Sequence, residues 1–114
     1  MNQIFFPDNI LPQVANNETI LIKLIKMFID SYEESLLELE KSLECGDFDT
    51  FQKQAHHMKP TILILFPKSN HETIKYLEAK SSPLSNEETH LEFKNLKSDV
   101  NLFVEEALNF LSKK

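Results

Sequence analysis

The sequence predicts an all-α fold: an antiparallel up-down four-helix bundle with a short N-terminal capping segment, formed by residues 1–114 as a single domain. Apolar residues recur at steps of three and four along most of the chain, which is the period of an amphipathic helix. The chain has 1 glycine in 114 residues, too few for the tight turns of a β protein. The segments between the helical patterns are short, and short connections favour antiparallel neighbours. We expect helices at about 17–45, 48–66, 70–80 and 86–112.

The segment before the first helix is too apolar to be a free tail. Residues 4–7 read Ile-Phe-Phe-Pro and residues 10–12 read Ile-Leu-Pro, so we expect them to cover one end of the bundle. The first helix should begin after Asn16 or Asn17, whose side chain can cap its first turn. It should end at Gly46, because glycine readily adopts the left-handed conformation at a helix end. Its apolar stripe consists of Leu21, Leu24, Phe28, Tyr32, Leu36, Leu39 and Leu43.

The second helix follows directly, with Asp47 as its expected N-cap. It should end near Phe66, because Pro67 follows and the residue before a proline is pushed out of the helical region. Its core face keeps the helical spacing. That face is expected to contain Phe48, Phe51, Ala55, Met58, Ile62 and Leu65.

Two capping-box patterns mark the starts of the last two helices. Ser69 is followed three residues later by Glu72, and Ser85 is followed by Glu88. Residues 81–84, Ser-Ser-Pro-Leu, form the short connection between these helices. Their core faces are expected to contain Ile74, Leu77, Phe93, Leu96, Val100, Phe103, Ala107 and Phe110.

Composition excludes several classes of function. The net charge is -6 and the chain contains no arginine, whereas nucleic-acid binding relies on clustered Lys and Arg. No apolar run approaches the roughly 18 residues of a membrane span, and no secretory signal pattern is present. Cys45 stands alone, so an internal disulfide and a Cys-x-x-Cys site are excluded. We expect a cytoplasmic monomer, with no nucleic acid and no membrane among its partners.

The strongest chemical signal is the run Ala-His-His-Met-Lys-Pro at residues 55–60. A projection at about 100° per residue places His56 and His57 on opposite flanks of the core face. The two histidines therefore cannot share one ligand. The flank of His56 also carries Gln52, Lys59 and Leu63.

These neighbours suggest a role for the first histidine. An exposed imidazole is mostly unprotonated at neutral pH and keeps a nucleophilic ring nitrogen, so His56 is a candidate phosphoryl acceptor. Lys59, one turn later, can stabilise the added negative charge. Gln52, one turn earlier, can donate a hydrogen bond to one ring nitrogen and orient the other outward. Leu63 is a candidate apolar contact for a partner.

This combination resembles the histidine-containing phosphotransfer (HPt) domain family. That family has a pattern close to Ala-His-x-Leu-Lys-Gly on the second long helix of a four-helix bundle. Residues 55–60 match the pattern, with Met58 in place of leucine and Pro60 in place of glycine. The Gly-Asp-Phe turn at residues 46–48 precedes the helix, as it often does in the family. The resemblance spans about residues 20–111, although its specific core is only about fifteen residues long.

The resemblance implies a phosphoryl carrier of a two-component phosphorelay, which is not an enzyme. His56 would be the phosphoacceptor and Lys59 its cationic neighbour. The expected partners are a response-regulator receiver domain, whose aspartate donates or accepts the phosphoryl group, and a hybrid sensor histidine kinase. The receiver would hold the Mg²⁺ ion, so no cofactor or metal is expected on this chain. A single glycine also cannot form the glycine-rich loop of an ATP site.

Pro60 is the main departure from the family pattern. Proline lacks the amide that would bond the carbonyl of His56. It also takes the place of a small residue on the surface where a partner is expected to dock. Leu63 is expected on the same surface.

Two alternatives stay open. A helical adaptor could keep the bundle and bind a receiver or sensor kinase without carrying phosphate, and Pro60 is the residue that favours this alternative. A metal-binding bundle could use the Glu-x-x-His element formed by Glu87 and His90. Such a site needs two of these elements, and the sequence contains one.

Overall fold

The computed structural model describes residues 3–79 and 87–114. Within these ranges the regular elements are all helical, so the predicted all-α class is confirmed. The elements are the α-helices α1 (Pro7–Ile10), α2 (Glu18–Cys45), α3 (Phe48–Leu65), α4 (Lys68–Ala79) and α5 (Glu87–Ser112), with the 3-10 helix η1 (Leu11–Val14) between α1 and α2.

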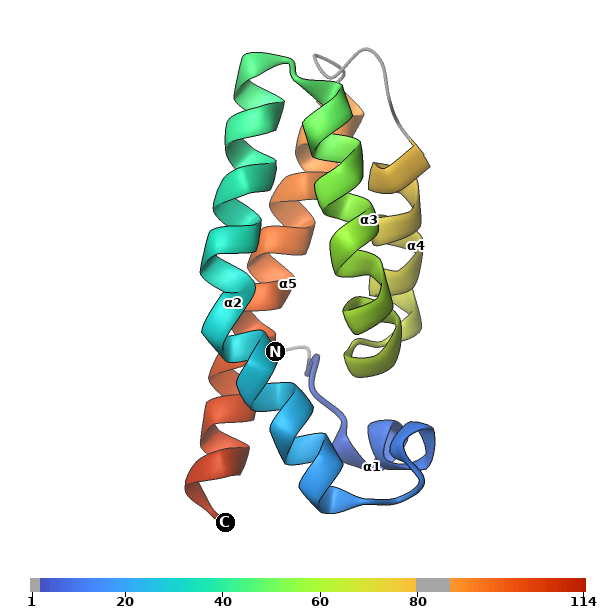
Figure 1. Cartoon of the computed structure of the whole chain (residues 1–114), viewed down its shortest axis with the longest axis vertical. Coiled ribbons are helices and arrows are strands. Elements are labelled where there is room, and N and C mark those ends of the chain that lie inside the picture. The colour runs from blue at the N-terminus through green and yellow to red at the C-terminus, as the bar shows by residue number, and fades with distance from the viewer. Residues whose placement is uncertain (1–2, 80–86) are drawn as a thin grey trace.

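The four long helices alternate in direction. In Figure 1, α2 runs upward, α3 downward, α4 upward and α5 downward. Helix α3 packs against α2 and α4, and α5 packs against the same two helices. The molecule measures 43 × 24 × 24 Å along its principal axes, so these helices set its length. None of the helices in the described ranges is both long enough and apolar enough to cross a membrane.

The prediction of four helices is wrong in number, because the N-terminal segment contains a fifth, α1, and the 3-10 helix η1. Each has a proline in its first two positions, Pro7 in α1 and Pro12 in η1. The fixed φ of proline suits the first turn of a helix. Elements of four residues are too short to show a helical period in the sequence, which explains why they were not expected.

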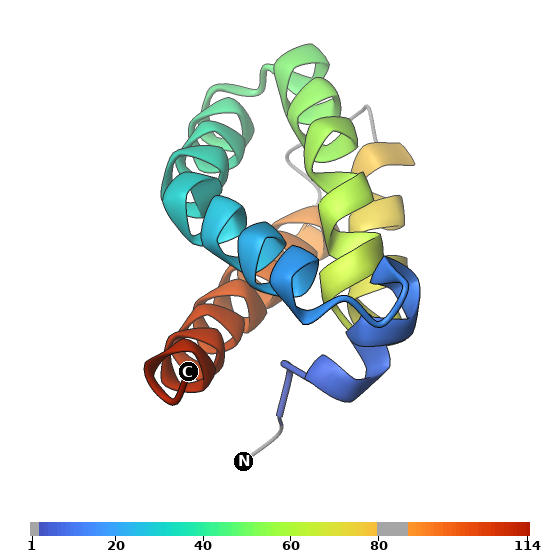
Figure 2. The same ribbon diagram turned by 60° about the horizontal axis from the view of Figure 1, so that its bottom comes forward.

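The N-terminal segment packs beside the C-terminal end of α3 and adds side chains to the core. Ile4, Phe5 and Ile10 are buried in the core. The side-chain amide of Gln13 donates to the carbonyl of Ile64 over 3.2 Å, at the C-terminal end of α3. Figures 1 and 2 show α1 beside that end of α3.

Local capping determines the boundaries of α2 and α3 as predicted. The side chain of Asn17 accepts the N–H of Ile20 over 3.1 Å, which satisfies a donor in the first turn of α2. Gly46 ends α2 at φ 73°, a left-handed conformation that glycine adopts without steric cost. The side chain of Asp47 then accepts the N–H of Thr50 over 3.2 Å at the start of α3.

Helix α4 begins two residues before the predicted position. It starts at Lys68, so Ser69 lies inside the helix and is not its N-cap. The carbonyl of Pro67 accepts the N–H of Asn70 over 3.0 Å, and the fixed φ of proline favours helix entry at this point. The predicted capping residue Ser85 and the predicted connection at residues 81–84 lie outside the described residues.

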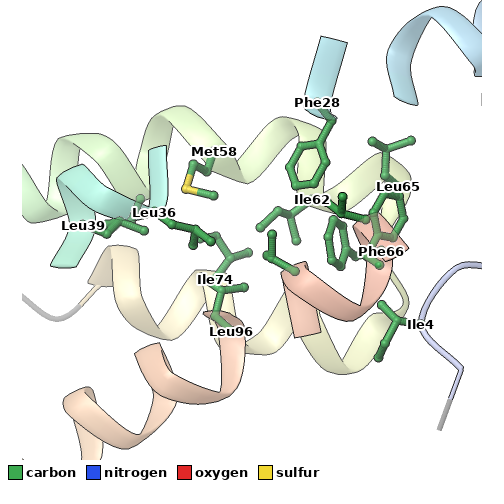
Figure 3. Packing of buried hydrophobic residues seen from close by; sticks show 14 of the residues in the cluster. Ile4, Phe28, Leu36, Leu39, Met58, Ile62, Leu65, Phe66, Ile74 and Leu96 are labelled. Carbon is green, nitrogen blue, oxygen red and sulfur yellow. The ribbon is translucent and has the colours of Figure 1, made fainter. Parts of the chain in front are cut away.

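The long helices bury one continuous hydrophobic core (Figure 3). Phe48 was expected on the core face of α3, but it is 42% exposed. It is the first residue of α3, at the end of the molecule where the chain turns from α2 into α3 (Figure 1). The fully buried residues of the four long helices include Leu21, Ile25, Leu39, Phe51, Ala55, Ile62, Ile74, Leu77, Leu96, Val100 and Phe103.

Candidate functional site

Helix α3 presents His56 to solvent because its opposite face is buried. Ala55 and Met58, the neighbours of the two histidines in the chain, are 0% and 5% exposed. The side chain of His56 is 72% exposed. The helix continues without interruption through Pro60, so the helical spacing that was predicted for this face is present.

A carboxylate from α4 joins the two residues that the sequence singled out. Nδ1 of His56 lies 2.8 Å from Oε2 of Glu78. Nζ of Lys59 donates to the other oxygen of the same carboxylate, Oε1, over 2.9 Å. Glu78 is the next-to-last residue of α4, so the contact between α3 and α4 brings the three side chains together.

Gln52 also contacts Glu78, but at its backbone and not at its carboxylate. Its side-chain amide donates to the carbonyl of Glu78 over 3.0 Å, and carbonyls in the last turn of a helix lack an intrahelical donor. The sequence predicted a hydrogen bond from Gln52 to the imidazole; in the structure the amide contacts the residue that holds the imidazole. We call His56, Lys59, Gln52 and Glu78 the α3–α4 site.

The hydrogen bonds at Glu78 determine which nitrogen of His56 carries a proton. The hydrogen bond from Lys59, and then the one from His56, lower the pKa of the Glu78 carboxyl below its ordinary value. An ionised carboxylate only accepts hydrogen bonds, so Nδ1 is the nitrogen that donates. The lone pair of the neutral ring is therefore on Nε2. A nucleophilic nitrogen results, in a side chain that is mostly exposed.

His57 lies nearer to this site than the helical projection implied. An open hollow of about 470 Å³ is lined by both His56 and His57. The projection had placed them on opposite flanks, but a wide hollow on an exposed helix face reaches both. The hydrogen bond to the carboxylate of Glu78 comes from His56. The hollow is lined by Asp49, Gln52, Lys53, His56, His57 and Glu78.

The two residues predicted to contact a partner follow the site along α3. Pro60 is exposed and Leu63 is half-buried. Both lie within the same helix as His56. Their role in docking remains a prediction.

The predicted alternative of a metal site has no cluster of ligands to support it. Within residues 3–79 and 87–114, no group of three or more His, Cys, Asp or Glu side chains is arranged to hold a metal ion. Glu87 and His90, the Glu-x-x-His element of the sequence, are both exposed on α5.

Glu78 is the residue of the α3–α4 site that was not expected from the sequence. It directly follows the buried Leu77, so it lies on a flank of α4 and not on its outer face. That position was readable from the sequence. Which flank of α4 meets the histidine flank of α3 depends on how the two helices pack, and no motif in the sequence specifies this.

Comparison with known proteins shows a likeness in fold. No protein-family model and no curated protein sequence matches the chain. Among solved structures, the HPT domain of a sensor hybrid histidine kinase from Shewanella is similar, with a TM-score of 0.86 and 17% sequence identity. The alignment covers 96% of this chain and 95% of that domain. The chain therefore has the fold of an HPt domain over nearly its whole length.

Proposed function

We propose that this protein is a histidine phosphotransfer domain of a two-component phosphorelay, with His56 as the phosphoacceptor. The observation that carries the proposal is an exposed imidazole whose Nδ1 is held by Glu78, on a chain with the fold of an HPt domain. The run at residues 55–60, which resembles the family pattern, places His56 where that pattern has its histidine.

The proposed reaction moves one phosphoryl group without an external base. The lone pair on Nε2 of His56 attacks the phosphorus of an aspartyl phosphate on the partner. A nitrogen–phosphorus bond forms, and the bond from phosphorus to the aspartyl oxygen breaks, so the carboxylate leaves with the electron pair. The ring keeps its proton on Nδ1 and becomes a cation beside the carboxylate of Glu78.

The other residues of the site position or stabilise the reacting groups. Lys59 is the cation that stabilises the phosphoryl group. The side-chain amide of Gln52 donates to the backbone carbonyl of Glu78. Gln52 therefore acts on the imidazole indirectly, by positioning Glu78. Transfer in the opposite direction, to a second receiver, uses the same groups in reverse order.

The proposal places the remaining chemistry on the partners. A response-regulator receiver domain supplies the aspartate and holds Mg²⁺, and a hybrid sensor histidine kinase starts the relay. This protein acts as a cytoplasmic monomer that carries the phosphoryl group, without an ATP site of its own. Pro60 and Leu63, on the exposed side of α3 beyond His56, contact the docked receiver.

Incubation with a phosphorylated receiver tests the proposal. We expect label on this protein that is labile in acid and stable in alkali, and that is absent from the His56→Gln variant. His57→Gln is the matched control, because it changes the adjacent residue in the same way and should be labelled normally. Label that persists in His56→Gln but disappears in His57→Gln would overturn the assignment of the acceptor.

The same experiment separates the relay from an adaptor that carries no phosphate. Exposed Pro60 keeps the adaptor as the second candidate, because a rigid ring on α3 near His56 changes how closely a receiver can approach. A complex with the receiver that forms without any transfer of label, and that forms equally well with Pro60→Gly, would support the adaptor. Transfer that is faster with Pro60→Gly supports the relay and shows that the ring obstructs it.

A further inference from the structure

The cation of the α3–α4 site is already engaged before any phosphoryl group arrives. Nζ of Lys59 is 2.9 Å from Oε1 of Glu78, and the two side chains are 26% and 24% exposed. Lys53, which lines the hollow beside His56, pairs with Asp49 over 3.2 Å. A phosphoryl group on His56 must therefore compete with a carboxylate of this chain for its neutralising lysine.

We propose that Glu78 makes His56 a short-lived phosphoryl store, by competing with the phosphoryl group for Lys59 and by holding the proton on Nδ1. This inference rests on the proposed function, since it concerns the phosphorylated state of His56. It assigns Glu78 as a positioning residue that favours onward transfer over retention of the phosphoryl group.

The first effect is electrostatic. The phosphoryl group adds negative charge at Nε2, while the carboxylate of Glu78 stays at Nδ1 of the same ring. One lysine then lies between two anions, so its positive charge is shared between the carboxylate and the phosphoryl group. The negative charge of Glu78 thus opposes the charge of the phosphoryl group itself, which a neutral side chain at that position would not do.

The second effect concerns the leaving group. When the phosphoryl group passes to the aspartate of a receiver, the nitrogen–phosphorus bond breaks and the ring takes back the electron pair. With the proton held on Nδ1, the ring leaves as neutral imidazole. Without that proton it would leave as an imidazolate anion, which is a far poorer leaving group. A carboxylate hydrogen-bonded to Nδ1 favours the protonated ring, so both effects act in the same direction.

Glu78→Gln tests both effects, because glutamine keeps a carbonyl that can accept from Nδ1 but has no charge. The isolated protein can be phosphorylated with phosphoramidate, which removes any effect of docking. We expect the phosphorylated His56 of Glu78→Gln to persist about three- to tenfold longer than that of the wild type near neutral pH. Titration of the phosphorylated ring by ³¹P NMR should show that the variant loses the Nδ1 proton at a lower pH.

Glu72→Gln is the matched control. It makes the same change of charge on the same helix, at an exposed residue of α4, and should leave the lifetime and the titration of the phosphorylated ring unchanged. A lifetime that lengthens equally in both variants would show a general effect of net charge and would overturn the proposal.

Competition for the lysine is tested separately, by introducing Lys59→Met into the wild type and into the Glu78→Gln variant. If Glu78 withholds Lys59 from the phosphoryl group, Lys59→Met should shorten the lifetime more in the Glu78→Gln background than in the wild type, which a double-mutant cycle measures. Equal effects in the two backgrounds would exclude competition.

The outcomes distinguish this inference from the proposed function. Wild-type protein that takes up no phosphoryl group on His56, from phosphoramidate or from any receiver, would overturn both. Wild-type protein that accepts the group on His56 but has the same lifetime and ring titration as Glu78→Gln would leave the relay in place and overturn the role of Glu78.

Discussion

The α3–α4 site and the aromatic cluster near the N-terminal segment are held together by different forces. The site consists of polar side chains on an exposed face, joined by hydrogen bonds to Glu78. The aromatic cluster consists of rings that contact one another and are mostly removed from water. Its members are Phe5, Phe28, Tyr32, Phe66, Phe103 and Phe110.

Phe103 is the centre of the aromatic cluster. It stacks on Phe66 with ring centroids 4.3 Å apart. Phe5 and Phe28 meet it edge-on, at 5.3 and 5.5 Å. The ring is 0% exposed, whereas the imidazole of His56 is 72% exposed.

This contrast separates stability from function. Burial of apolar surface contributes most of the free energy of folding, whereas exposed polar pairs contribute little. Substitutions in the aromatic cluster should therefore change the free energy of unfolding and leave the chemistry of His56 intact. Substitutions in the α3–α4 site should change the chemistry of His56 and have little effect on the free energy of unfolding.

The largest loss of stability is expected from Phe103→Ala. Removal of a fully buried aromatic ring typically costs about 3–5 kcal/mol, and here it leaves Phe66, Phe5 and Phe28 without their common partner. Chemical denaturation followed by circular dichroism measures the change. The folded fraction should still accept label on His56. A loss below about 1 kcal/mol would show that the cluster repacks and is not the stabilising centre that its geometry indicates.

A smaller loss is expected from Glu106→Ala, which detaches the N-terminal segment. Oε1 of Glu106 accepts the backbone N–H groups of Ile4 and Phe5, over 2.8 and 2.9 Å. Donors left without a partner cost about 1–3 kcal/mol when they are buried. Hydrogen exchange at these two amides should rise together with the loss of stability. Glu105→Ala, at the exposed neighbouring residue, is the matched control and should change neither quantity.

The sequence predicted the aromatic cluster only in part. Helical spacing identified four of its members as residues of core faces, because each belongs to a long amphipathic helix: Phe28, Tyr32, Phe103 and Phe110. The contribution of Phe5 was expected only as general cover for one end. Its contact with Phe103 is accompanied by backbone hydrogen bonds to Glu106, and no local pattern in the sequence specifies a pairing so distant along the chain.

The residues of the α3–α4 site were likewise expected only in part. His56 and Lys59 follow from spacing within one helix, which the sequence displays directly. Glu78 does not, because its contact depends on how α4 packs against α3.

The start of α4 was misplaced for a local reason: Pro67 initiates the helix, and the later Ser69–Glu72 pattern resembles a capping box without acting as one.

A still smaller effect on stability is expected from Glu78→Gln, and it should depend on pH. The hydrogen bonds from Lys59 and His56 lower the pKa of Glu78 in the folded protein. Its contribution is therefore present above the pKa of the unfolded chain and is lost as the pH falls through the lower folded value. We expect a loss of about 1 kcal/mol or less at pH 7. Denaturation curves of both proteins should converge in acid; a difference that grows as the pH falls would contradict this sign.

The smallest effect on stability is expected from His56→Gln, the variant with the largest expected effect on function. Its side chain is mostly exposed, and substitutions at such positions usually change the free energy of unfolding by no more than about 0.5 kcal/mol. Glutamine can also donate to the carboxylate of Glu78 in place of Nδ1. Denaturation of His56→Gln and of the control His57→Gln should thus coincide with that of the wild type, while only His56→Gln loses the label. If His56→Gln unfolded as readily as Glu106→Ala, the imidazole would be part of what holds α3 to α4, and loss of label in that variant could no longer be assigned to loss of the acceptor.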